Sequence, residues 1–327
     1  MRAWRVHEHG GPEDVLRLDT VPDPAPGPGE VLVRVTAAAL NFADVLRCRG
    51  EYQERVDPPF VPGSEACGTV VAAGAGVDGP PAGERVIVAR RRGGCFAELV
   101  VAPAAAVLPV PPSMDDVTAA GFHVTYQTGY VALHTRARLQ AGETLLVHAG
   151  AGGTGSAAIE LGKAAGARVI ATAGGPEKVE ICRSLGADLA LDSRAGDFVP
   201  AVLEATDGRG ADVVFDPVGG DVFDRSRRCV AFEGRILVIG FAGGRIPEAP
   251  ANHLLVKNYS VVGVHWALYE EHRPEVIRRA HDDLVALHAA GRIRPGAARV
   301  IGLDEVPAAL GALARRATVG KVVARVA

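Results

Sequence analysis

The stretch LLVHAGAGGTG, residues 145–155, decides the fold of this chain. Its first half is an apolar run typical of a buried strand, and its second half is a glycine-rich turn of the form G-x-G-x-x-G. A helix is expected to follow over Ser156 to Ala165, and a second strand over Arg168 to Thr172. A strand, a glycine turn and a helix in this order indicate a dinucleotide-binding site.

Each glycine of the turn has its own expected task. Gly150 is expected to allow the tight turn, Gly152 to let the backbone approach a pyrophosphate, and Gly155 to let the helix pack closely on the strand. The helix N-terminus then offers N–H groups and a partial positive charge to the phosphates. We therefore expect a nucleotide here, with Gly153 and Thr154 also in contact with it.

Composition excludes several classes of function. The chain has 327 residues, 48% of them hydrophobic, which is enough for about two domains with a sizeable core. A net charge of −3 gives no electrostatic reason to expect a nucleic-acid or membrane partner. No apolar run reaches the ~20 residues of a membrane span, and the first residues lack the apolar stretch of a signal peptide. Five scattered cysteines without a C-x-x-C pair predict reduced thiols in a cytoplasmic protein.

The pattern of predicted secondary structure changes after Pro111-Pro112. Before this point, short strands such as Glu30 to Ala37 are separated by Gly/Pro turns, which predicts a partly open antiparallel β-barrel. A short helix over Ala43 to Arg49, closed by Gly50, interrupts these strands. From about residue 125 to 263, six strands alternate with helices, which predicts a parallel, doubly wound α/β sheet. The expected strands are 144–149, 168–172, 189–191, 212–216, 235–240 and 261–264.

The end of the second strand of this sheet bears on the choice of cofactor. NAD enzymes usually place an acidic residue there to accept a hydrogen bond from the ribose 2′-hydroxyl. This chain has instead the open turn Gly174-Gly175, with Lys178 shortly after it. Because a 2′-phosphate needs room and a cation, the pattern favours NADPH. The alternative interpretation of Lys178 is an ordinary solvated helix residue.

Several motifs together give the chain a family resemblance. It resembles the quinone oxidoreductase branch of the medium-chain dehydrogenase/reductase superfamily over nearly its whole length. The motifs are NFAD at 41–44, RGEY at 49–52, PGSEACG at 62–68, GERV at 83–86, GCFAE at 94–98, the glycine turn, LGAD at 185–188, DPVGG at 216–220 and ATVGK at 317–321.

The resemblance implies a division into two domains. A GroES-like, β-rich catalytic domain would contain residues 1–124 and 265–327, and a Rossmann NADPH-binding domain would contain residues 125–264. The resemblance also implies a homodimer, joined edge to edge through the strand that matches Ser260 to Trp266. An exposed apolar edge strand invites such pairing on general grounds, although local loops covering the edge are the alternative.

Zinc-dependent members of the superfamily carry metal ligands that this chain lacks. They have Cys where this chain has Asn41, His where it has Ser64, and Cys at about Val124. Asp44 and Glu65 remain, but two carboxylates without Cys or His make a poor zinc site. We therefore expect no metal, and we interpret both carboxylates as structural polar residues.

The resemblance also suggests catalytic and cofactor-binding residues. Asn41 would hold the nicotinamide ribose or the substrate oxygen, Tyr52 matches a tyrosine that donates a proton in related enoyl-thioester reductases, and Thr128 matches a threonine that contacts the nicotinamide. The alternatives are a half-buried aromatic residue for Tyr52 and a helix-start hydroxyl for Thr128. Lys321 would attract a phosphate or an anionic substrate, or else lie on the surface. The expected cofactor contacts are Asn41, Thr128, Gly150, Gly152, Gly153, Thr154, Gly155, Gly174, Lys178, Ser193, Phe241 and Lys321.

Taken together, these residues predict an NADPH-dependent oxidoreductase. It would reduce quinones or activated double bonds, meaning α,β-unsaturated carbonyl compounds, by metal-free hydride transfer. Ser193 stands where the family often has a tyrosine beside the 2′-phosphate. Two alternatives remain at this point: a non-catalytic NADPH-binding protein of the crystallin or redox-sensing kind, and a zinc alcohol dehydrogenase.

Overall fold

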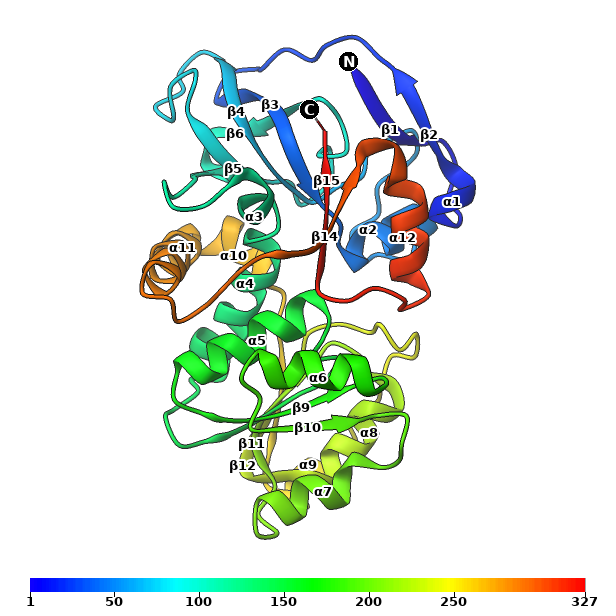
Figure 1. The fold of residues 1–327 in the computed structure, drawn as a ribbon, viewed down its shortest axis with the longest axis vertical. Helices are drawn as coiled ribbons and strands as arrows, with labels where there is room; N and C mark the ends of the chain where they lie inside the picture. Colours follow the sequence, from blue (N-terminus) through cyan, green and yellow to red (C-terminus); the bar gives the residue numbers. More distant parts are fainter. Residues whose placement is uncertain (327) are drawn as a thin grey trace. The chain divides into compact units, whose positions relative to one another are not determined.

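The computed structural model describes residues 1–326, and the chain forms two compact units (Figure 1). The first unit contains Met1–Val124 together with the chain from Pro295 onward, and the second unit contains Thr125–Arg294. The second unit is therefore an insertion into the chain of the first. Within the described residues, no helix is long and apolar enough to cross a membrane.

The first unit is built on a seven-stranded sheet, counted over residues 1–326. Its order is β14-β15-β3-β4-β5-β7, with β6 also paired to β3, and every pair is antiparallel except β14–β15. The strands are β3 (Glu30–Ala39), β4 (Glu65–Ala73), β5 (Arg85–Ala89), β6 (Leu99–Pro103), β7 (Val107–Pro109), β14 (Ala297–Gly302) and β15 (Lys321–Arg325). A hairpin of β1 (Arg2–Val6) and β2 (Leu16–Thr20) and the helices α1 (Pro12–Val15), α2 (Phe42–Arg49), α3 (Asp116–Ala120) and α12 (Val306–Ala314) complete the unit.

Strand β3 shows why this sequence forms a sheet with one buried face. Val31, Val33 and Val35 are fully buried and alternate with the more exposed Leu32 and Arg34. This two-residue period places every second side chain in the core of the first unit. The predicted strand from Glu30 and the predicted β-rich fold class of this part are confirmed.

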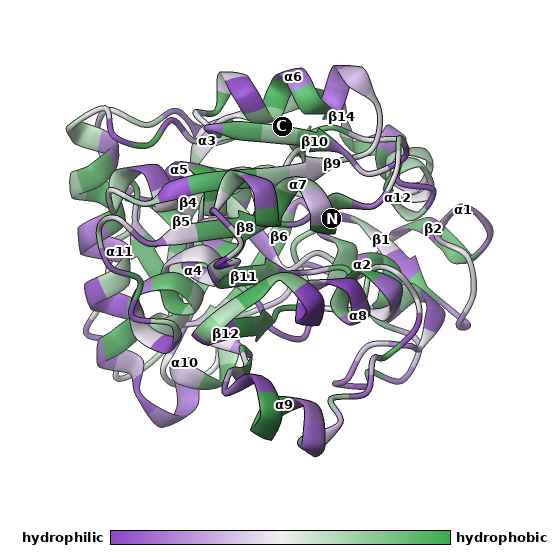
Figure 2. Ribbon diagram, turned by 90° about the horizontal axis from the view of Figure 1, so that it is seen from below, coloured by the Kyte–Doolittle hydropathy of each residue, from purple (hydrophilic) through white to green (hydrophobic). Residues whose placement is uncertain are grey.

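The second unit is a parallel six-stranded sheet covered by helices, again counted over residues 1–326. Its strands are β8 (Thr144–Val147), β9 (Arg168–Ala173), β10 (Leu189–Asp192), β11 (Ala211–Asp216), β12 (Val230–Val238) and β13 (Ser260–Gly263). Its longer helices are α4 (His123–Tyr130), α5 (Gly153–Ala164), α6 (Pro176–Ser184), α7 (Phe198–Ala205), α8 (Gly220–Cys229), α9 (Ala251–Lys257) and α11 (Pro274–Ala289); α4 begins in the first unit. Strand β11 is mostly hydrophobic, whereas α8 combines hydrophilic residues with hydrophobic ones (Figure 2), and its buried residues are Gly220, Phe223, Ser226 and Cys229.

Strand order identifies the binding edge of this sheet. The order β10-β9-β8-β11-β12-β13 places β8 and β11 side by side in the middle, where the winding direction reverses. In doubly wound sheets, ligands bind beyond the carboxyl ends of the strands at this switch point. The predicted α/β fold class, a Rossmann sheet beside a β-rich part, is confirmed.

The return of the chain to the first unit comes later than the sequence predicts. The expected boundary lies at residue 265, but the second unit extends to Arg294. Helix α11 stays with this unit because it is tied to α4: Gln127 Nε2 donates to Ile277 O at 3.0 Å, and the Tyr130 hydroxyl bonds Asp283. Arg294 N then donates to Glu160 of α5.

Candidate active site

The glycine turn after β8 contains a left-handed residue that is not a glycine. Ala149 has φ 51°, a conformation that L-residues adopt at some cost, whereas Gly150 has no positive φ. The expectation that Gly150 allows the tight turn is therefore corrected. Gly150 is needed for space, since a Cβ there would lie 2.8 Å from Cys182 Sγ and 3.1 Å from Ala171 Cβ.

Gly155 lets α5 begin directly against the end of β8. A Cβ at this position would lie 2.2 Å from the carbonyl oxygen of Ala149, far inside normal contact distance. At Gly152 the corresponding distance to the same oxygen is 3.2 Å, and the backbone is extended at φ −88°. The structure thus shows the close helix–strand approach that the fingerprint predicts for Gly155.

The N-terminus of α5 is suited to an anion. The helix begins at Gly153, three residues before the predicted start, with Gly152 as the residue that precedes it. No side chain within residues 1–326 caps this end; the hydroxyl of Ser156 donates back to Gly152 O at 2.6 Å. The N–H groups of Gly153, Thr154 and Gly155 therefore point out of a helix end of positive dipole.

A second glycine turn links β9 to α6. Gly175 has φ 94°, so this position favours glycine. The carboxylate of Asp192, at the end of β10, accepts from Gly175 N at 2.8 Å and from Arg194 N at 2.9 Å. These bonds hold the turn against β10, and they lower the pKa of Asp192.

Two cations lie at this second turn. The guanidinium of Arg194 lies over Gly174, because a Cβ built on Gly174 would be 3.1 Å from Arg194 Nε. Burial and the nearby Arg194 charge lower the pKa of Lys178, on the first turn of α6. The Arg194 charge also lowers the pKa of Asp192, the carboxylate that accepts from Arg194 N. Arg194 was missed from sequence, where only the adjacent Ser193 was singled out.

Two further predicted contacts of the second unit are buried or half-buried. Thr128 is 5% exposed and is the sixth residue of α4, so it is not the helix-start hydroxyl that was the alternative. Phe241 follows β12 and packs near Gly219, where a Cβ would lie 3.1 Å from the Phe241 ring.

His148, at the end of β8, is a packed core residue. Its Nδ1 lies 2.9 Å from the Thr172 hydroxyl, and its Nε2 lies 2.8 Å from the Ser226 hydroxyl. Since Ser226 donates its proton to Val222 O, Nε2 must be the donor to Ser226. Burial lowers the pKa of His148 to about 3, so the ring is neutral and is not a base for chemistry near pH 7.

A polar cluster is buried in the first unit at the N-terminus of α2. It consists of Asn41, Asp44, Arg47, Ser64, Glu65 and Lys321, and each member is at most 7% exposed. Asn41 precedes the first residue of α2, and its N–H donates to Asp44 Oδ2 at 2.9 Å. This bond satisfies one N–H at the helix start and fixes Asn41 in place.

Lys321 and Glu65 orient the side chain of Asn41. Lys321 Nζ donates to Asn41 Oδ1 at 2.6 Å and pairs with Glu65 Oε1 at 2.6 Å. Asn41 Nδ2 donates to the same Glu65 oxygen at 3.0 Å, while the other oxygen accepts from Val124 N. Lys321 is therefore not a surface lysine, and Glu65 balances its charge within the unit.

Arg47 and Asp44 form the second half of the cluster. Arg47 Nη1 donates to the Ser64 hydroxyl at 2.7 Å and to Asp44 Oδ1 at 3.3 Å, and Ser64 donates to Asp44 Oδ1 at 2.7 Å. The guanidinium carbon of Arg47 stands 4.3 Å from the centre of the Tyr52 ring. Tyr52, which is half-buried, thus adjoins the polar cluster through Arg47.

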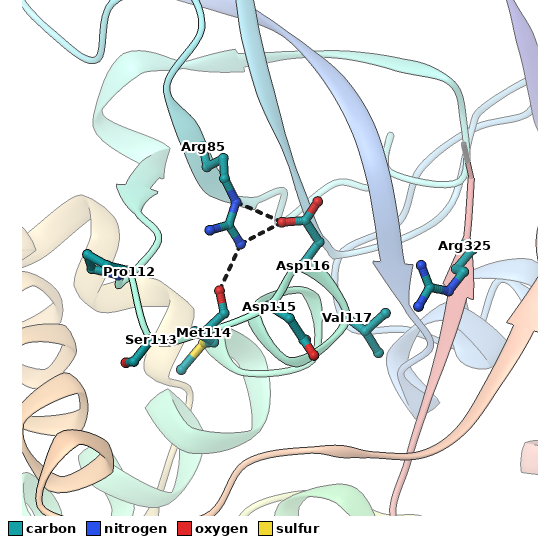
Figure 3. A pocket seen from close by; sticks show the side chains of 8 residues that line it. All are labelled: Arg85, Pro112, Ser113, Met114, Asp115, Asp116, Val117 and Arg325. Carbon is teal, nitrogen blue, oxygen red and sulfur yellow. Dashed lines mark hydrogen bonds and ion pairs between the residues drawn. The ribbon is translucent and has the colours of Figure 1, made fainter.

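A surface cavity of the first unit contains none of these residues. It has a volume of about 550 Å³ and lies beside the start of α3 (Figure 3). Its Arg85 is already bound to Asp116 at 2.6 Å and to Met114 O at 2.8 Å. We assign no chemistry to this cavity.

Comparison with known proteins decides the family. Residues 27–112 match the family described as alcohol dehydrogenase GroES-like domain, and residues 153–282 match the family described as zinc-binding dehydrogenase. The quinone oxidoreductase-like protein 2 homolog of Nematostella vectensis is 40% identical over 327 residues, covering 98% of this chain and 88% of that protein. The chain belongs to the zinc-independent quinone oxidoreductase family. The predicted resemblance is confirmed, and the chain is an oxidoreductase of the medium-chain dehydrogenase/reductase superfamily.

Solved structures of this family and its neighbours share the whole fold. Escherichia coli quinone oxidoreductase, solved in complex with NADPH, has a TM-score of 0.91 at 28% identity, with 100% of each chain covered. A mycobacterial protein solved with NADPH has a TM-score of 0.93 at 32% identity, also with 100% of each chain covered. An enoyl reductase named CurK has a TM-score of 0.89 at 27% identity, covering 99% of this chain and 98% of that one.

The polar cluster does not fit a catalytic zinc, the metal named by one matching family. Within residues 1–326, no group of three His, Cys, Asp or Glu side chains is arranged to hold a metal ion. Both carboxylates of the cluster are already paired with fixed cations, Asp44 with Arg47 and Glu65 with Lys321. A divalent ion would have to displace those cations, and the six residues of the cluster include neither the His nor the Cys that zinc prefers.

Proposed function

We propose that this protein uses NADPH to reduce quinones or α,β-unsaturated carbonyl compounds. The observation that carries the proposal is the pairing, in one unit, of an uncapped helix N-terminus on the glycine turn with a cationic second turn at Gly174. The first feature suits a pyrophosphate and the second suits a 2′-phosphate. Relatives solved with NADPH, and the enoyl reductase among the neighbours, support the same reading.

The second unit would hold the cofactor through backbone and charge. We propose that the N–H groups of Gly153, Thr154 and Gly155 bind the pyrophosphate, because no protein side chain in the described residues satisfies that helix end. Lys178 and Arg194, with the hydroxyl of Ser193, would bind the 2′-phosphate through charge-assisted hydrogen bonds. Thr128 and Phe241 would contact the nicotinamide. When bound, NADPH supplies a hydride to the acceptor.

The first unit would supply the polar groups for the acceptor. Asn41 is held by Lys321 and Glu65 in one orientation, so it is preorganised to position a ribose or substrate oxygen. The hydroxyl of Tyr52 has no hydrogen-bond partner among residues 1–326, and we propose that it gives the proton that follows hydride transfer. We assign Lys321 the task of fixing Asn41.

The edge of the second unit's sheet supports a homodimer. Strand β13 ends the strand order, and all four of its residues are at least partly exposed. It stops at Gly263, shorter than the expected stretch to Trp266, because a 3₁₀ turn (Trp266–Leu268) follows. We propose that β13 pairs with the same strand of a second copy. Sedimentation of the purified protein should give a dimer, and a monomer at micromolar concentration would contradict this.

An acceptor screen tests the reaction. The purified protein should oxidise NADPH, followed by absorbance at 340 nm, with members of a panel of naphthoquinones, benzoquinones, enones and enoyl thioesters. Binding of NADPH without turnover of any acceptor in the panel would refute the enzymatic proposal in favour of a binding protein.

Charge removal at the second turn tests the cofactor assignment. Lys178→Ala and Arg194→Gln should each weaken NADPH binding about 5- to 150-fold, since charge-assisted hydrogen bonds contribute roughly 1–3 kcal/mol after screening. NADH binding should stay nearly constant, because NADH has no 2′-phosphate. Arg183→Gln is the matched control, as this exposed residue of α6 is paired with Glu180. An equal loss for both cofactors would exclude the assignment.

A further inference from the structure

Arg47 is an unusual residue for the last turn of a short surface helix, because its side chain is only 3% exposed. The guanidinium of Arg47 donates hydrogen bonds to the Asp44 carboxylate, to the Ser64 hydroxyl and to the carbonyl of Arg91. Its Nε, in contrast, is buried without a hydrogen-bond partner within residues 1–326. A buried arginine with one unsatisfied donor is costly, so a gain elsewhere is needed to explain this arrangement.

The ring of Tyr52 stacks over one face of the Arg47 guanidinium plane. The distance of 4.3 Å from Arg47 Cζ to the ring centre is that of a stacked cation–π contact. Tyr52 follows Gly50, the left-handed residue that ends α2 at φ 71°, and lies in a segment of turns and bends without a helix or strand. Because the backbone of Tyr52 belongs to no helix or strand, the contact with Arg47 is what fixes the position of the Tyr52 ring.

We propose that Arg47 is a positioning residue for Tyr52, which holds the phenol ring over its guanidinium, so that a phenolate formed by proton transfer lies beside a fixed positive charge. The inference rests on the proposed function, in which Tyr52 is the proton donor. Arg47 itself need not touch the substrate, and the Asp44–Ser64 pair keeps it in place.

The charges around Tyr52 agree with this role. Burial raises the pKa of Tyr52, and the Arg47 charge opposes that rise most strongly among the neighbouring groups. Glu54 and Asp44 raise the pKa, and Arg91 lowers it. Glu54 and Arg91 form an ion pair at 2.9 Å, so their opposite effects largely cancel at the ring.

The proton step can be written with its charges balanced. After the acceptor has received a hydride, it carries a negative charge on oxygen or on the conjugated carbon. The O–H bond of Tyr52 breaks, its proton bonds to that atom, and the electron pair stays on the phenolate oxygen. The positive charge of Arg47 stabilises the phenolate, and a proton from water then restores the phenol.

The variants must distinguish the effect of the Arg47 charge on Tyr52 from any effect on the folding of the protein. Arg47→Gln alone would leave Asp44 buried and unpaired and endanger the fold. Asp44→Asn leaves the Arg47 guanidinium bonded to the Ser64 hydroxyl and the Arg91 carbonyl, so the informative comparison is Asp44→Asn against Asp44→Asn/Arg47→Gln, which differ at position 47 alone; urea unfolding of both variants first checks that each one folds. Arg49→Gln is the matched control, because it removes an arginine from the same helix whose side chain is 39% exposed. Arg47→Lys in the parent chain keeps the charge and serves as the conservative variant.

Fluorine NMR reads the acidity of Tyr52 directly. The protein is labelled with 3-fluorotyrosine, which brings phenol titration to a lower pH, and the Tyr52 signal is assigned by its absence in Tyr52→Phe. The titration midpoint should rise by about one to two pH units from Asp44→Asn to Asp44→Asn/Arg47→Gln, as expected for one charge near the ring at an effective dielectric constant of about 20. Arg49→Gln should leave the midpoint in place, and Arg47→Lys should keep it within about half a unit of the parent.

The outcomes separate this inference from the function on which it rests. An unchanged midpoint on loss of the Arg47 charge, or a Lys variant that behaves like Gln, overturns the role of Arg47. In quinone or enone turnover, the alkaline limb of the kcat profile should move in the same direction as the midpoint, with KM nearly unchanged. A midpoint that moves while the kcat profile stays fixed upholds the effect of Arg47 on Tyr52 and removes Tyr52 as the proton donor.

Discussion

Substituting Gly155 by alanine is the sharpest test of how the glycine turn works. The added Cβ would lie 2.2 Å from Ala149 O and 2.8 Å from Gly150 Cα, both of which are backbone atoms. To restore a distance of 3 Å, the helix start and the strand end must separate by about 0.8 Å. Neither contact can be relieved by rotating a side chain.

The shift has two energetic consequences. Overpacking of this kind costs about 1–3 kcal/mol, while alanine is about 1 kcal/mol better than glycine inside a helix, so the stability should fall by about 0–2 kcal/mol. The binding effect is larger, because the N–H groups at the start of α5 move with the helix. Loss of one charge-assisted hydrogen bond, worth about 1.5–3 kcal/mol, should raise the Kd about 10- to 150-fold.

The assay is a fluorescence titration with NADPH and with NADH, combined with urea unfolding. Both cofactors should weaken by a similar factor, since both carry the pyrophosphate. Gly152→Ala is the comparison variant; its Cβ would meet Ala149 O at 3.2 Å, so its stability should stay close to that of the parent. A Gly155→Ala protein that folds and binds both cofactors like the parent would refute the reasoning.

Two further predictions concern buried titratable groups. Because the pKa of His148 falls from its usual 6.5 to about 3 on folding, the unfolded chain binds one more proton between these values. The free energy of unfolding should therefore drop by about 1.4 kcal/mol per pH unit on acidification below pH 6.5. In His148→Asn this pH-dependent decrease should be absent, which urea unfolding at pH 7, 5.5 and 4.5 would measure. Burial also raises the pKa of every cysteine, to about 12 for Cys48 and about 11 for Cys182. The folded protein should thus react with a thiol reagent at pH 8 far more slowly than the urea-unfolded chain, in which all five thiols should react; rapid reaction of a folded thiol would contradict its burial.

The parts of the fold that follow from local patterns were predictable from sequence. Alternation in the strand from Glu30 and the glycine fingerprint at 150–155 both depend on neighbours along the chain; the strand begins where expected, and the helix of the fingerprint begins three residues before its predicted start. The left-handed Ala149 was not predictable, because alanine carries no signal for a positive φ. Its conformation is imposed by the packing of α5 against the strand end.

The candidate site contains contacts that no local pattern encodes. Lys321 meets Glu65 across most of the chain length, so spacing could not show that its charge is already balanced. Arg47 reads as one more arginine of a short helix, and only the folded unit shows it buried against Ser64 and Tyr52. The sequence pattern of helix α11 does not show which unit it joins, whereas its bonds to Gln127 and Tyr130 show that it belongs to the second unit.

The position of β15 between β14 and β3 has a consequence for synthesis on the ribosome. The second unit is continuous in the chain and is translated entirely before residue 295, so it is free to fold while translation continues. The sheet of the first unit lacks the strand between β14 and β3 until residues 321–325 emerge, and Glu65 pairs with Lys321 only then. A nascent chain released early would thus contain a complete second unit and an incomplete first unit.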